Sequence, residues 1–276
     1  MMILETILPL IQRKPFPWVD DEPTKDDLEH IFTQRSDEFD RHKLKDSMLT
    51  DLRTGKAKLV TKSGPFAKVL AVVYPDTVIP WKLFGEIFVA FGPPKAGNGE
   101  PKAGNGEPKA GKGPAAWRIV WFAHPKRREI SPGEVPGPEH VNGGYTYPCD
   151  NETIVIYREE EVCRVLVHEL LHASCTDDHS LDIIDQEAST ETWAELFLIA
   201  IQAKTPRAAA ALWAKQAKWI ADQEHLLRTR HNVNDRTSYA WRYTVARRKV
   251  LEGLGIYLPA GVFPASNSLR FTHAGV

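Results

Sequence analysis

The pattern of apolar and polar positions predicts a strand, a helix and a second strand in the first half of the chain. Residues 66–74 form an apolar, β-branched run of strand length. Residues 80–91 begin with proline and carry apolar residues at helical spacing, and residues 117–123 form another buried-strand pattern. A helix between two such strands is typical of a βαβ unit.

A repetitive segment interrupts this unit before its second strand. Residues 93–114 repeat the unit PKAGNGE, with a degenerate third copy, and contain no apolar residue larger than alanine. Such a segment cannot bury enough surface to offset the entropy lost on folding. We therefore expect a mobile insertion loop within one domain, in preference to a linker between two domains.

A hairpin and a helical second half follow. Residues 145–158 read as two strands joined by a tight polar loop. They lead into an apolar helix that we expect to begin near Glu159, with acidic residues at its positive end. Further helices are expected over residues 182–203, from Thr205 onward, and over residues 238–253.

Composition narrows the classes of partner and compartment. The 276 residues include 35 Lys and Arg against 36 Asp and Glu, so overall charge favours neither nucleic acid nor an anionic membrane. The apolar N-terminus lacks the order of a signal peptide, and no apolar run reaches the length of a membrane span. Three cysteines without a CxxC pair argue against a disulfide framework. We expect an intracellular, cytoplasmic protein.

The clearest candidate for chemistry is the stretch VLVHELLHASCTDDHS at residues 165–180. His168 and His172 lie four residues apart, and therefore about one turn apart on one helical face, with Glu169 beside them. Two imidazoles at this spacing can chelate one zinc ion, and the carboxylate can reach a zinc-bound water. A catalytic zinc also needs a third protein ligand.

One candidate for that ligand is local. Asp178, six residues after His172, and His179 beside it resemble the metzincin pattern. Metzincins carry glycine where this chain has Cys175, and they need a methionine downstream, which this chain lacks. The local alternative therefore loses its support. Cys175 could also lie near the metal, where a fourth protein ligand would make the zinc structural.

The other candidate is distant. Glu187, Glu191 and Glu195 recur every four residues on one face of the helix expected at 182–203. Eighteen residues separate His172 from Glu191, and HELLH-x18-E over about residues 165–197 resembles the gluzincin zinc peptidases.

The resemblance implies specific roles. His168, His172 and Glu191 would bind Zn²⁺, Glu169 would act as general base and later as acid, and Glu195 would orient the first histidine. Glu187 shares their helical face, so the alternative assignment, with Glu187 as the ligand and Glu191 in the orienting role, stays open.

The resemblance has limits. The aminopeptidase branch of the gluzincins carries Asn-Glu-Gly around the ligand, where this chain has threonines beside Glu191, so aminopeptidase activity is not implied. An oxyanion donor is also needed, and the candidates in order are Tyr243, Tyr239 and His231.

These observations predict a zincin-like α+β fold with a small mixed sheet, the HExxH helix and a helical C-terminal half. Residues 1–60 would be a partly helical N-terminal extension, whose helix starts with Thr24 and Asp27 as a capping box. Residues 61–260 would form the catalytic domain and residues 261–276 a tail. The expected function is zinc-dependent hydrolysis of a peptide or protein substrate, and the fold resemblance implies that this substrate lies antiparallel to a strand of the hairpin at residues 145–158. The alternative is a zinc-stabilised structural or partner-binding protein without turnover.

Overall fold

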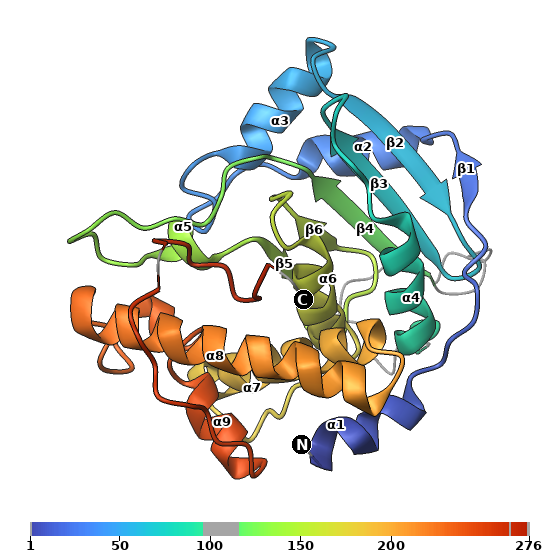
Figure 1. The fold of residues 1–276 in the computed structure, drawn as a ribbon. Coiled ribbons are helices and arrows are strands. Elements are labelled where there is room, and N and C mark those ends of the chain that lie inside the picture. Colours follow the sequence, from blue (N-terminus) through green and yellow to red (C-terminus); the bar gives the residue numbers. More distant parts are fainter. Residues whose placement is uncertain (1, 96–115, 265, 275–276) are drawn as a thin grey trace.

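The computed structural model describes residues 2–95, 116–264 and 266–274, and its centre is one mixed β-sheet (Figure 1). Within the described residues the sheet has six strands in the order β1-β2-β3-β4-β6-β5. The strands are β1 (Val19–Asp21), β2 (Lys58–Ser63), β3 (Ala67–Val73), β4 (Trp117–Phe122), β5 (Gly144–Thr146) and β6 (Ile154–Ile156). This sheet confirms the predicted α+β class.

The predicted βαβ unit is confirmed. β3 and β4 are parallel, with Ala67 opposite Trp117, and α4 (Trp81–Phe91) connects them. Gly92 ends α4 with a φ of 73°, a conformation that glycine adopts without steric cost. The loop predicted at 93–114 lies almost entirely outside the described residues.

The predicted hairpin is also confirmed, and it forms one end of the sheet. β5 and β6 pair antiparallel, with Tyr145 opposite Val155, while β6 continues the parallel pairing with β4. Among the described strands, β5 pairs only with β6, so its other side is a sheet edge.

Two helices of the N-terminal part, α2 (Lys25–Thr33) and α3 (Leu44–Arg53), cover one face of the sheet. They follow α1 (Met2–Ile7) and the short 3-10 helix η1 (Leu8–Leu10) in the chain. The capping box at the start of α2 is confirmed, because the Thr24 hydroxyl accepts from the backbone of Asp27 and the Asp27 carboxylate accepts from the backbone of Thr24. Apolar residues of α3, such as Met48 and Leu49, are fully buried with Leu70 and Val72 of β3.

The motif helix lies on the opposite face of the sheet. The side chains of Val69 and Ala71 alternate with those of Leu70 and Val72, as the two-residue period of a strand requires. Val69 and Ala71 share a core with α4, with α6 (Val162–Ala173) and with α7 (Ile183–Gln202). Full burial of a side chain the size of Val69 stabilises the fold by about 1.5–3 kcal/mol.

The C-terminal half is helical, as predicted, but one of its helices differs from the prediction. It comprises α7, α8 (Pro206–Arg230) and α9 (Arg247–Gly253), with α5 (Pro138–Val141) before the motif helix. The helix predicted over residues 238–253 is instead the short 3-10 helix η2 (Tyr239–Trp241), a turn and α9. The zincin identity of the fold stays a prediction.

The motif helix also starts later than predicted. α6 begins at Val162, because Glu161 adopts a left-handed conformation with a φ of 62°. The Glu161 carboxylate accepts bonds from Arg128 and from the backbone of Phe271 and Thr272. Contacts with distant segments, which local sequence does not reveal, fix this end of the helix.

The prediction that the chain has no disulfide is wrong. Cys149, in the hairpin loop, and Cys175, just after α6, are 26 residues apart and are joined by a disulfide bond. The backbone brings them together, since the amides of both residues donate to the carbonyl of His172. Disulfides persist mainly in oxidising compartments, so the expected intracellular location loses its argument from the cysteines. In the part of the chain that the structure describes, no helix is long and apolar enough to cross a membrane.

Candidate metal centre

The two histidines of the motif point their Nε2 atoms at each other. His168 and His172 lie one turn apart on α6, and their Nε2 atoms are 3.1 Å apart. The His168 side chain is 8% exposed and that of His172 is 12% exposed. Burying a polar ring is costly unless the ring has a polar partner, so the two Nε2 atoms need a further polar group beside them.

Glu187 on α7 supplies that group. Its Oε2 atom lies 3.5 Å from Nε2 of His168 and 3.7 Å from Nε2 of His172. The three ligand atoms all lie within 4.8 Å of one another. The same Oε2 atom is buried and makes no hydrogen bond. Among the described residues, His168, His172 and Glu187 are the group of His, Cys, Asp and Glu side chains that could hold a metal ion.

The outer nitrogens of both rings face carboxylates. Nδ1 of His172 lies 2.7 Å from Oδ1 of Asp177, and Nδ1 of His168 lies 3.2 Å from Oε1 of Glu191. The hydrogen bond to Asp177 favours the tautomer of His172 with its proton at Nδ1, which leaves the lone pair of Nε2 facing inward. Nδ1 of His168 makes no hydrogen bond, but the nearby charge of Glu191 favours the same tautomer. Two such lone pairs and a carboxylate oxygen then converge on one point. Three electron-pair donors repel one another unless a cation lies between them, so the group fits a metal ion.

Without metal, a proton supplies part of the positive charge between these donor atoms. Burial lowers the pKa of His172, but the hydrogen bond to Asp177 and the nearby charge of the Glu187 carboxylate outweigh it and raise that pKa to about 10. Burial and the neighbouring His172 hold the pKa of His168 well below its usual value. These opposite shifts of the two pKa values are expected when the two Nε2 atoms share one proton across their short contact.

The structure therefore brings Glu187, rather than Glu191, to the two Nε2 atoms. Glu191 lies one turn further along the same face of α7, behind the His168 ring, and its carboxylate forms an ion pair with Arg164. Fourteen residues, not eighteen, separate His172 from Glu187. This geometry favours the alternative assignment, with Glu187 as the ligand and Glu191 in the orienting role, because spacing alone does not distinguish adjacent turns of one helical face.

Glu195, which was expected to orient the first histidine, lies elsewhere. Its side chain is buried, and its Oε2 atom accepts a bond of 3.1 Å from the Thr272 hydroxyl. Burial raises the pKa of Glu195 to about 7, although Arg164 and Arg247 oppose the rise. The position against the outer nitrogen of His168 belongs to Glu191.

Glu169 lines the same cavity as His168, His172 and Glu187, the candidate metal-binding group. This cavity has a volume of about 280 Å³. Burial raises the pKa of Glu169 to about 8, despite the opposing charge of His172. Gly144 of β5 leaves room for this carboxylate, because a Cβ atom there would lie 3.0 Å from Oε1 of Glu169 and closer still to Val165.

Two of the three predicted oxyanion donors line this cavity, and the third does not. Tyr239 and Tyr243 are lining residues, and their hydroxyl oxygens are 3.5 Å apart. Burial raises the pKa of both phenols, so both keep the proton they would donate. His231 is absent from the cavity wall, and its Nδ1 atom lies 2.8 Å from the carbonyl oxygen of Glu134.

Two residues around the site, Asp177 and Arg164, were not predicted from the sequence. Asp177, which contacts His172, lies within the motif stretch next to the Asp178 that was considered. Arg164 precedes His168 by four residues, so helical spacing could have revealed it on the same face. Cys175 was considered as a possible fourth ligand, but the disulfide occupies its sulfur.

No protein-family model, no curated protein and no solved structure matches this chain. The gluzincin resemblance therefore rests on the motif residues alone. The structure adds one observation, the buried group of His168, His172 and Glu187 that could hold a metal ion.

Proposed function

We propose that the protein is a zinc-dependent hydrolase of peptide bonds whose metal is held by His168, His172 and Glu187. The observation that carries the proposal is the convergence of their three donor atoms within 4.8 Å at a cavity that also contains Glu169. Two imidazoles and one carboxylate, with a position left open for water, form the ligand set of many catalytic zinc sites.

The surrounding residues supply the rest of the chemistry. Zinc, when bound, would polarise the scissile carbonyl and lower the pKa of a water molecule. Glu169 accepts the proton that this water loses and passes it to the leaving amine. A buried carboxyl with a pKa near 8 suits a group that must both accept and donate a proton near neutral pH.

The cavity wall suits an extended peptide. Gly144, Tyr145 and Thr146 of the edge strand β5 line the cavity, and a sheet edge offers backbone groups that can pair with an added strand. The phenols of Tyr239 and Tyr243 are donors for the oxygen on which negative charge develops. This arrangement supports a peptide or protein as the substrate.

The disulfide bears on the alternative of a structural zinc site. A structural zinc is usually enclosed by four protein ligands. Cys175 was the nearest candidate for a fourth, and its bond to Cys149 removes it. The ligand set in the described residues therefore leaves a position open, which favours turnover over a purely structural role.

The test is peptidase activity measured on a broad peptide library. We expect the zinc-loaded wild type to cleave peptides, and Glu169→Gln to keep its zinc while losing about 10²–10⁴-fold in kcat, because the proton acceptor is gone. Glu252→Gln, a change at a half-exposed residue of α9, is the matched control and should leave activity unchanged. A zinc-loaded wild type without activity on any peptide would reject the peptidase and favour the structural alternative.

A further inference from the structure

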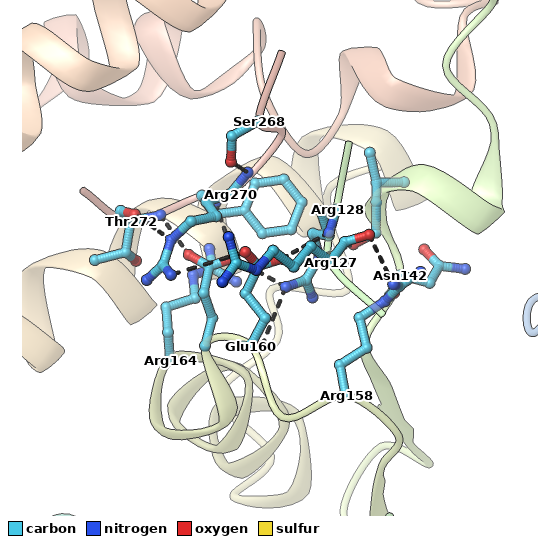
Figure 2. A network of polar contacts seen from close by, with 12 residues as sticks. Arg127, Arg128, Asn142, Arg158, Glu160, Arg164, Ser268, Arg270 and Thr272 are labelled. Carbon is cyan, nitrogen blue, oxygen red and sulfur yellow. Dashed lines mark hydrogen bonds and ion pairs between the residues drawn. The ribbon is translucent and has the colours of Figure 1, made fainter. Parts of the chain in front are cut away.

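The C-terminal segment, residues 266–274, returns to the first turn of α6. The backbone amides of Phe271 and Thr272 donate to the Glu161 carboxylate at 3.1 and 2.6 Å. The Thr272 hydroxyl donates to Glu195 on α7. Figure 2 shows Thr272 and Ser268 of this segment on the side of Arg164 that lies away from the helix. The segment is therefore bonded to both helices that carry the metal-binding group.

The Phe271 ring lies among three buried guanidinium groups. Its centroid is 4.8 Å from Cζ of Arg164, 5.1 Å from Cζ of Arg128 and 5.7 Å from Cζ of Arg247. Each of these arginines is at most 2% exposed. An aromatic ring attracts such cations and fills the space between them, so it restricts where each guanidinium can lie.

Arg164 connects this cluster to the metal centre. Its Nη2 atom donates to the Glu191 backbone carbonyl at 3.3 Å, and it forms an ion pair with the Glu191 carboxylate. The other oxygen of that carboxylate lies 3.2 Å from Nδ1 of His168. A displaced Arg164 would let Glu191 move, and the orientation of the His168 ring would then no longer be fixed.

We propose that the C-terminal segment is a positioning element of the metal centre, in which Phe271 holds Arg164, Arg164 holds Glu191, and Glu191 orients His168. The inference rests on the proposed metal site. None of the segment's residues belongs to the metal-binding group, so the effect passes through the arginine. Removing the Phe271 ring should weaken metal binding even though every ligand is present.

The test compares Phe271→Ala with Phe263→Ala in the full chain. Phe263 is a matched control, because it lies in the same terminal part of the chain and its ring also stacks on an arginine, Arg230, at 4.3 Å. Zinc affinity is measured by competition with a chelator, and the visible spectrum of the cobalt-substituted protein reports ligand geometry. The melting temperature of the metal-free protein reports folding.

We expect Phe271→Ala to bind zinc about 10–100-fold more weakly than wild type, with an altered cobalt spectrum, and Phe263→Ala to match wild type. Phe271→Trp, which restores a ring, should recover most of the affinity. Phe271→Leu keeps an apolar side chain there and serves in place of alanine if that variant does not fold. Wild-type affinity and spectrum in a folded Ala or Leu variant would overturn the proposal. A wild type that binds no zinc would instead overturn the proposed function.

Discussion

At the scale of single residues, the site depends on which nitrogen of each histidine carries the proton. Asp177 and Glu191 face the outer nitrogens, so both inner nitrogens can present lone pairs to a metal. In the metal-free protein the pKa of His172 is raised to about 10, so this ring holds an extra proton at neutral pH. A metal must displace that proton to bind.

Zinc binding should therefore release protons and strengthen with pH. Because the pKa of His172 lies well above 7, we expect at least one proton released per zinc at pH 7, and affinity rising about tenfold per pH unit below that pKa. Calorimetry in buffers of different ionisation enthalpy measures the proton count. Buffer-independent heats with a pH-independent affinity would contradict a protonated His172 in the metal-free protein.

Only part of the site can be predicted at this scale. The i, i+4 spacing of His168 and His172 identifies two candidate ligands, because helix geometry alone puts them on one face. The choice between Glu187 and Glu191 depends on how α7 packs along α6, which is a tertiary property. Spacing counted from the motif selects the helical face but not the turn.

At the scale of elements, the local pattern of apolar residues predicts helices and strands well where their contacts are with neighbours along the chain. β3, α4 and β4 follow their sequence periods because each is a short apolar element beside its partners along the chain. The start of α6 and the split of the predicted helix at 238–253 do not follow such a period. At the start of α6, distant bonds form between Glu161 and the C-terminal segment.

The disulfide is an element-scale constraint that local pattern also fails to reveal. It ties the hairpin loop at Cys149 to Cys175, two residues before Asp177. Closing a loop of this length stabilises a fold by about 3–4 kcal/mol. It also restricts the motion of the segment around Asp177, whose carboxylate contacts His172.

We expect the double variant Cys149→Ser, Cys175→Ser to lose about 2–4 kcal/mol of unfolding free energy and to bind zinc more weakly than wild type. Urea unfolding of the metal-free protein gives the first quantity, and chelator competition gives the second. Reduced wild type is the control, and it should behave like the double variant. Equal stability and affinity in the oxidised and reduced wild type would show that the bond does not support the site.

At the scale of the whole molecule, the cavity combines segments from the entire chain. Phe39 comes from the loop before α3, the metal-binding group from α6 and α7, and Phe271 from the C-terminal segment. The Tyr145 hydroxyl, on the edge strand, donates to Gln34 beside the Phe39 loop at 2.6 Å. No sequence period relates these positions, so the sequence identifies the centre of the site and tertiary structure supplies its walls.

The most direct test of the account is the zinc content of two variants that differ by one helical turn. Glu187→Gln and Glu191→Gln make the same chemical change on the same face of α7. After loading and dialysis, zinc per chain is measured by mass spectrometry alongside wild type. We predict about one zinc in wild type, little in Glu187→Gln, and retained but more weakly held zinc in Glu191→Gln. Full zinc in Glu187→Gln together with none in Glu191→Gln would contradict the account.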